Sequence, residues 1–271
     1  MAGILQSLKA YSIVGVGKIA RCYRTYRLNI IKVNQGDAVM PAEVFGIEHF
    51  LYIGITATIA ASGLLIAKKY AKSDKAQSIF LKSLALLLFI SILTNRLSQV
   101  FRYGAVRWEQ IIPDSYCGMT SLVLSLAVLF GKKDNKALHF VWILGLFGGI
   151  STVIYPAFIG QGPTVFYLPT ISGLLHHSLC ATVSVAILIF GQIRITYKKW
   201  YCTLFGFTSY LTVGAFLIGC LGFSDAFHIY TPLIDGTPLT TWVMAPIYAV
   251  CYALLLFIIE TVRKKCGKQE I

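Results

Sequence analysis

The sequence predicts an all-α, polytopic membrane protein, a bundle of about seven transmembrane helices. Three observations lead to this prediction: 56% of the 271 residues are hydrophobic, only 13% are charged, and the apolar residues gather into long runs. Soluble domains carry about 25% charged residues, and a helix needs about twenty apolar residues to cross a bilayer. The runs are too long for barrel strands, so helices are the remaining way to satisfy the backbone in lipid.

The apolar runs define the order of the elements. We expect helices at residues 46–67, 79–100, 115–131, 137–159, 165–192, 201–223 and 240–261. They form one membrane domain at residues 44–262, preceded by a basic segment at 1–43 and followed by a basic tail at 263–271. No internal repeat and no soluble domain is visible in the sequence.

Basic residues follow the connections between these helices in strict alternation. The connections after the first, third and fifth helices and the C-terminus carry fourteen of them: Lys68, Lys69, Lys72, Lys75, Lys132, Lys133, Lys136, Arg194, Lys198, Lys199, Arg263, Lys264, Lys265 and Lys268. The other connections carry three: Arg96, Arg102 and Arg107. This bias predicts a cytoplasmic C-terminus and a first helix that begins outside. The net charge of +13 is therefore a sign of topology, and no nucleic-acid partner is expected.

The N-terminal residues 1–36 contain six basic residues and no acidic one. We interpret this segment as an interfacial amphipathic helix that binds anionic headgroups. A cleaved organellar transit segment is the alternative. Accordingly, we expect a multi-pass protein of a bacterial plasma membrane, or of an organellar membrane or endomembrane.

Polar residues, which are costly in lipid, converge near the outer ends of the predicted helices. His49 lies at the start of the first helix, and Pro113 is placed to begin the third. This puts Asp114, Ser115 and Cys117 in the first turn of the third helix. A thiol at a helix N-terminus is favoured as thiolate, and a nearby imidazole would complete a nucleophile pair. On residue type alone, a small buried cysteine is the alternative.

Histidines also lie at the fifth helix and beyond the sixth. His176 and His177 interrupt an apolar run in SGLLHHSLC, and Asp225 and His228 lie in the following outer loop. Adjacent helical residues point about 100° apart, so we expect one of the paired histidines to face the interior and the other a neighbouring helix. No metal-ligand spacing supports a metal site, and no cofactor is expected.

Two further features concern packing. GLFGGIS at 145–151 predicts a close-packing helix face, because small residues let helices approach in lipid. We expect Arg96 either to reach the outer interface or to pair with Glu48 or Glu109.

The order of several short motifs is informative. They are F-x-x-E-H ending at His49, P-x-x-x-C ending at Cys117, G-G…Y-P at 148–156, a histidine in the fifth helix, and W-x-x-x-P-x-Y at 242–248. This order resembles the YwaF-like integral membrane family, whose eukaryotic counterpart is transmembrane protein 164, over about residues 44–262. At two positions the chain departs from the family patterns. Ser115 stands where the bacterial pattern has a histidine, and Asp114 stands where the eukaryotic pattern has its cysteine.

The resemblance implies a function. The eukaryotic member is regarded as a phospholipid acyltransferase that uses a membrane cysteine and histidine, which implies the pair Cys117 and His177, with His49 at the family's helix-one histidine. Membrane lipids are then the expected substrates. The candidate binding residues are Ser115, Asp114, His176, Asp225, His228 and Arg96.

Three functions remain open at this point. In a membrane acyltransferase or lipid-acyl hydrolase, Cys117 would attack an ester carbonyl and His177 would act as general base. In a solute-binding or transport protein, the outer polar groups would hold a ligand. The third function is a non-catalytic accessory subunit, and the sequence does not determine an oligomeric state.

Overall fold

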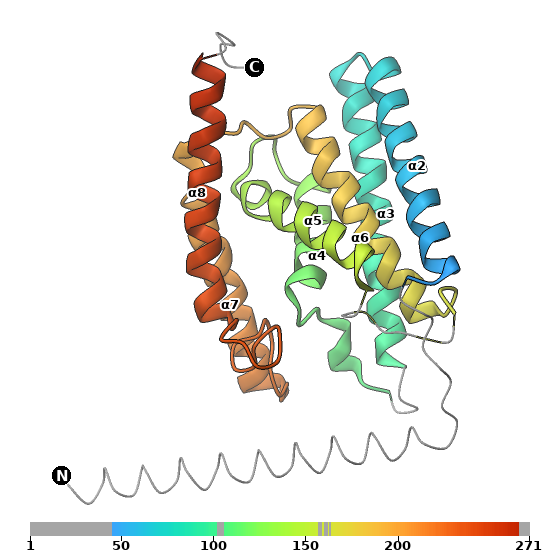
Figure 1. Cartoon of the computed structure of the whole chain (residues 1–271), viewed down its shortest axis with the longest axis vertical. Helices are drawn as coiled ribbons and strands as arrows, with labels where there is room; N and C mark the ends of the chain where they lie inside the picture. The colour runs from blue at the N-terminus through green and yellow to red at the C-terminus, as the bar shows by residue number, and fades with distance from the viewer. Residues whose placement is uncertain (1–44, 102–105, 157–158, 160–161, 163, 266–271) are drawn as a thin grey trace, which may run out of the picture. The chain divides into compact units, whose positions relative to one another are not determined.

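The computed structural model describes residues 45–101, 106–156, 159, 162 and 164–265. Within these residues the secondary structure is helical, without strands (Figure 1). The α-helices are α2 (Ile47–Tyr70), α3 (Asp74–Val100), α4 (Tyr116–Leu129), α5 (Lys136–Ile154), α6 (Leu168–Ile189), α7 (Cys202–Leu221) and α8 (Thr241–Lys265), with short 3₁₀ turns η1 (Trp108–Ile111) and η3 (Tyr197–Lys199). The predicted all-α class and each predicted helix are confirmed. The segment for which we predicted an interfacial helix lies outside the described residues.

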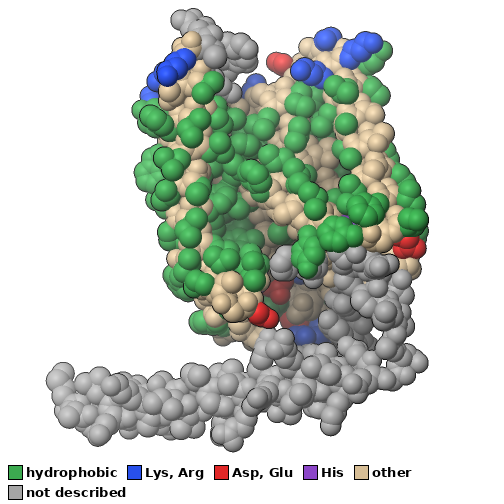
Figure 2. All heavy atoms as spheres, in the orientation of Figure 1, with side chains coloured by type: hydrophobic (Ala, Val, Ile, Leu, Met, Phe, Trp, Pro, Cys, Tyr) green, Lys and Arg blue, Asp and Glu red, His purple; other side chains and the backbone are tan. Residues whose placement is uncertain are grey.

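Six helices of the described chain are long and apolar enough to cross a membrane: α2, α3, α5, α6, α8 and the run Tyr197–Leu221 that contains α7. The exception is α4, whose 14 residues extend about 21 Å, less than the roughly 30 Å of a bilayer core. Large apolar side chains are exposed along the outer helices, and Figure 2 shows them as a broad apolar surface below the basic residues at the top of the view. The chain is a multi-pass membrane protein.

Side-chain caps determine where several helices begin. The Ser73 hydroxyl accepts a hydrogen bond from the Ala76 N–H at the start of α3, and the Asn135 side chain accepts one from Leu138 at the start of α5. At α4, Ser115 is the cap and Tyr116 the first helical residue, so Pro113 precedes the helix and does not begin it. Serine satisfies an open helix amide, which proline in the first turn does not do.

Two glycines of α5 let this helix approach α6 closely. A Cβ atom added at Gly149 would lie 2.6 Å from the backbone oxygen of His177, and one at Gly145 would lie 2.7 Å from Ser184 Oγ. No side chain larger than hydrogen fits at Gly149 without moving a helix backbone. The predicted close-packing face is therefore the contact that positions His177.

The basic connections meet at one end of the bundle, which we call the basic end. Asp134, after α4, accepts a hydrogen bond from the Arg194 N–H (2.8 Å), so the α4–α5 and α6–α7 connections lie together. Glu260, near the end of α8, accepts hydrogen bonds from Thr196 and Tyr197. The α2–α3 turn belongs to the same end, since α3 runs antiparallel to α6 and the rings of Phe80 and Phe190 lie 5.7 Å apart near its start. That this end is cytoplasmic remains a prediction.

Candidate functional site

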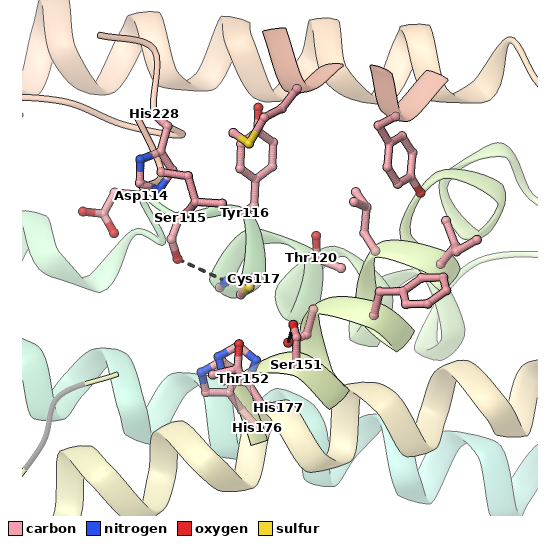
Figure 3. Close-up of a pocket in the computed structure, with 18 of the residues that line it drawn as sticks. Asp114, Ser115, Tyr116, Cys117, Thr120, Ser151, Thr152, His176, His177 and His228 are labelled. Atoms are coloured by element: carbon pink, nitrogen blue, oxygen red, sulfur yellow. Dashed lines mark hydrogen bonds between the residues drawn. The ribbon is translucent and has the colours of Figure 1, made fainter. Parts of the chain in front are cut away.

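A cavity of about 900 Å³ lies among α3, α4, α5, α6, α8 and the loop after α7 (Figure 3). One part of its wall is polar and includes Arg96, Asp114, Ser115 and His228. The other part is apolar and is built from α5 and α8 side chains such as Ile143, Leu144, Phe147, Met244 and Leu255. Cys117, Thr152, His176 and His177 also line it. The cavity is amphipathic along its length.

Cys117 is the second residue of α4, and the α4 N-terminus faces the cavity. The Ser115 hydroxyl accepts a hydrogen bond from the Gly118 N–H (3.3 Å), as the dashed line in Figure 3 shows. The first backbone amides of a helix have no intrahelical acceptor, so those of Tyr116 and Cys117 are available to a bound anionic group. The predicted first-turn position of Cys117 is therefore confirmed.

Cys117 and His177 both lie close to Gly148 of α5. A Cβ atom added at Gly148 would lie 3.4 Å from Cys117 Sγ. The His177 imidazole lies beside the backbone of the same residue. In Figure 3, Cys117 faces Thr152 and the two imidazoles across the cavity. The Cys117 thiol and the His177 imidazole therefore lie at the same turn of α5, which also carries the Thr152 hydroxyl.

The paired histidines point to the same place. The ring centroids of His176 and His177 lie 4.2 Å apart, and both residues line the cavity. His176 Nδ1 lies 3.2 Å from the Ser121 hydroxyl of α4. We expected one ring to face the interior and the other a neighbouring helix. His176 does contact the neighbouring helix α4, and both residues also line the cavity.

Arg96 points into the cavity, with 13% of its side chain exposed. Its Nη1 lies 3.3 Å from Asp114 Oδ1, and its Nη2 lies 3.4 Å from Asn95 Oδ1. The expected snorkelling or pairing with Glu48 or Glu109 is contradicted. Glu48 accepts hydrogen bonds from the segment before α6, and Glu109 pairs within η1 and its flank. Asp114 is closer because the α4 cap brings it to the cavity.

The loop after α7 holds His228 at the cavity in a strained backbone. Phe227 and His228 have φ angles of +52° and +56°, a conformation that costs non-glycine residues of order 1–2 kcal/mol each. The Asp225 carboxylate stabilises this turn by accepting hydrogen bonds from the N–H groups of Ala226, Ile229, Tyr230 and Thr231. Asp225 itself is not among the described residues that line the cavity. It acts on the site through His228.

His49 lies away from the cavity. Its Nε2 is 2.8 Å from the Val153 carbonyl, and its Nδ1 accepts a hydrogen bond from the Phe45 N–H (3.2 Å). Both ring nitrogens are occupied by backbone groups, and the residue is buried. In the structure His49 joins the start of α2 to the end of α5. Among the described residues, no group of three or more His, Cys, Asp or Glu side chains could hold a metal ion.

Sequence reasoning missed several polar residues of the site, among them Thr152 and Tyr248. Thr152 follows Gly148 by four residues and so lies on the same helix face, but the motif at 145–151 was interpreted for packing alone. Tyr248 ends the W-x-x-x-P-x-Y motif, lines the cavity, and has a buried hydroxyl without a partner in the described part of the chain. Helical spacing from the motif residues was the available signal for both.

Comparison with protein families decides the membership of the chain. The model of the TMEM164 family matches residues 44–262, which is most of the chain. The chain belongs to the TMEM164 family. In searches of curated proteins and of solved structures, nothing matches. The TMEM164 match covers α2 to α8 and therefore includes each of the residues that line the cavity.

Proposed function

We propose that this TMEM164 chain is a membrane acyltransferase or lipid-acyl hydrolase in which Cys117 is the nucleophile and His177 the general base. The observation that carries the proposal is that the thiol and the imidazole both lie close to Gly148, within an amphipathic cavity of about 900 Å³. Membrane lipids carry an ester bond between a polar headgroup region and apolar chains, which is the distribution of polarity along the cavity wall.

The exposure of two cavity residues supports entry of a substrate from the bilayer. Phe147 of α5 is 63% exposed and Cys251 of α8 is exposed, and both also line the cavity. The cavity is therefore open toward the lipid-facing surface between α5 and α8. An acyl chain can pass this opening while its ester stays near the α4 N-terminus.

The proposed first step transfers the acyl group to the enzyme. His177 takes the proton of the Cys117 thiol, and the sulfur attacks the ester carbonyl carbon. The amides of Tyr116 and Cys117 stabilise the negative charge on the carbonyl oxygen. When the C–O bond breaks, the protonated His177 returns the proton to the leaving alcohol, and a Cys117 thioester remains.

The second step releases the acyl group. A hydroxyl of a lysolipid, or water, loses its proton to His177 and attacks the thioester carbonyl carbon. The C–S bond breaks, and the Cys117 sulfur regains the proton from His177. Acyl transfer results with the lysolipid, and hydrolysis with water. In both steps, the His177 ring carries the proton between the Cys117 sulfur and the oxygen that leaves or attacks.

An electrophilic probe with a lipid tail tests this function. We expect the probe to label purified full-length protein at Cys117, and Cys117→Ser to abolish both labelling and acyl exchange between lipid and lysolipid. Cys251→Ser is the matched control, since Cys251 lines the same cavity from α8. Labelling that persists in Cys117→Ser, or acyl exchange that survives it, would refute Cys117 as nucleophile.

One observation favours a second candidate function, binding or transport of a lipid without covalent chemistry. The side chain placed to interact with the Cys117 thiol is that of Thr152 and not an imidazole. This function predicts lipid-dependent thermal stabilisation that survives Cys117→Ala, with no acyl exchange in the wild type.

A further inference from the structure

We propose that Arg96 and His228 form a subsite for a phosphate group at the polar end of the cavity. The subsite rests on the proposed function in one respect, namely that the cavity takes a lipid. It does not require that Cys117 reacts.

One nitrogen of each of these two side chains lacks a hydrogen-bond partner among the described residues. Arg96 Nε and His228 Nδ1 are buried without a hydrogen-bond partner among the described residues, and both side chains line the cavity. Buried polar groups are rarely left unpaired in native proteins, and those that are need an explanation. A ligand oxygen at the polar end of the cavity supplies the missing acceptor for both.

Asp114 contacts both Arg96 and the segment that carries His228. Its carboxylate pairs with Arg96 (3.3 Å), while its backbone oxygen accepts a hydrogen bond from the Phe227 N–H (2.7 Å), one residue before His228. Figure 3 shows the His228 ring beside Asp114. Arg96 comes from α3 and His228 from the loop after α7, so the two donors approach a ligand from different elements.

The backbone of the turn that carries His228 is strained. Phe227 and His228 both adopt left-handed φ angles, and the Asp225 carboxylate and Thr241 hold the turn. Strained non-glycine residues are kept where the surrounding structure fixes them, often at ligand sites. This turn places His228 at the wall of the cavity.

The chemistry of the donors fits phosphate. The Arg96 guanidinium gives Nη1 to Asp114 and Nη2 to Asn95, and its Nε–H remains to donate to a ligand oxygen. An N–H at His228 Nδ1 donates to another oxygen of the same tetrahedral group. Free phosphate and a lipid headgroup share this chemistry, so the experiment must separate them.

Binding is measured on full-length Cys117→Ser protein in detergent, which cannot turn over through that thiol. The ligands are lysophosphatidic acid, a monoacylglycerol and a fatty acid of the same chain length, and inorganic phosphate. We expect lysophosphatidic acid to bind at least about tenfold more tightly than the monoacylglycerol. Arg96→Gln and His228→Gln should each remove most of that preference while leaving monoacylglycerol binding unchanged. Arg107→Gln, near the same end but outside the cavity lining, is the control.

The outcomes separate the sources of phosphate and the two proposals. Arg96-dependent binding of lysophosphatidic acid supports a headgroup subsite, and Arg96-dependent binding of inorganic phosphate alone supports a free-phosphate subsite. Equal affinity for lysophosphatidic acid, monoacylglycerol and fatty acid overturns the subsite, as does a preference that survives His228→Gln and Arg96→Gln. Because the measurement uses Cys117→Ser, a missing acyl exchange refutes the proposed function and leaves this result intact. Should Arg96→Gln not fold, His228→Gln decides.

Discussion

Asp134 and Asp114 lie beyond opposite ends of α4, and their surroundings differ. Asp134 at the basic end accepts a hydrogen bond from the Arg194 N–H, lies 2.6 Å from His139 Nε2 and pairs with Lys199 at 3.3 Å. Asp114 has one ion-pair partner among the described side chains, Arg96, and the cavity lies beside it. Among the described residues, the aspartate at the basic end therefore has three protein partners for its carboxylate, whereas the aspartate at the other end has one ion-pair partner and lies beside a cavity.

The two aspartates indicate different roles for the two ends of α4: stability at the basic end and ligand binding or activity at the cavity. The Asp134 network joins the α4–α5 connection, α5 and the α6–α7 connection, and none of its members lines the cavity. The Asp114 network leaves Arg96 Nε and His228 Nδ1 unpaired at the cavity. We therefore expect substitutions at the basic end to reduce stability, and substitutions at the cavity to reduce ligand binding or activity.

The largest expected effect contrasts two histidines. His177→Gln should reduce acyl exchange by about 10²–10⁴-fold, because it removes the general base, while the unfolding temperature changes little. His139→Gln should lower the free energy of unfolding by about 1–3 kcal/mol and leave the rate per folded molecule unchanged, because it disrupts a buried charge-assisted hydrogen bond. Acyl exchange in proteoliposomes measures the activity of each variant, and thermal unfolding measures its stability. The contrast fails if the two variants lose activity equally at equal folded fraction.

Substitution of Gly149 tests the close packing of α5 against α6, which also positions His177. Gly149→Ala should destabilise the protein by about 1–3 kcal/mol, because the new Cβ would lie 2.6 Å from the His177 backbone oxygen and separate α5 from α6. Gly148→Ala is the control, since its Cβ would lie at an ordinary 3.4 Å from Cys117 Sγ. It should leave the unfolding temperature unchanged and reduce labelling of Cys117. Equal unfolding temperatures for wild type and Gly149→Ala would contradict the packing of α5 against α6.

Asp134→Asn should cost about 1–2 kcal/mol of stability near neutral pH. Burial raises the pKa of the Asp134 carboxyl, but hydrogen bonds from the Arg194 N–H, from His139 and from Lys199 outweigh it and hold the pKa below its ordinary value. A lowered folded-state pKa means that this stabilisation is present above the unfolded-state value near 4, and is lost as the pH falls through the folded-state pKa. Thermal unfolding from pH 6 to pH 3 should therefore narrow the gap between wild type and Asp134→Asn. A gap that widens toward pH 3 would contradict the network.

The smallest expected effect comes from the same substitution at the other end. Asp114→Asn should strengthen binding of lysophosphatidic acid a few-fold, because it removes the negative charge next to Arg96, and should cost less stability than Asp134→Asn. Binding and unfolding of the two Asn variants, measured side by side, give the comparison. Weaker phosphate-dependent binding in Asp114→Asn would count against the role of Arg96.

The helices could be predicted from the sequence because lipid forces apolar runs into helices, and α2 to α8 follow those runs. The start of α3 and the end of α5 could not, since α3 begins at Asp74 behind the Ser73 cap, ahead of the apolar run, and α5 ends at Ile154, two residues before Pro156. At the site, the first-turn position of Cys117 followed from Pro113 and from the start of an apolar run. The partners of Arg96 and the left-handed turn at His228 depend on contacts between distant segments, which periodicity does not record.

Intact-mass analysis of the full-length protein with a phospholipid substrate shows directly whether Cys117 carries the acyl group. We expect rapid acid quenching to trap a species heavier by one acyl group, which peptide mapping places at Cys117 and which hydroxylamine removes as it removes thioesters. His177→Gln should lower its rate of formation, and Cys251→Ser should leave it unchanged. Acyl exchange that proceeds at full rate with no acyl group on Cys117 would contradict the account.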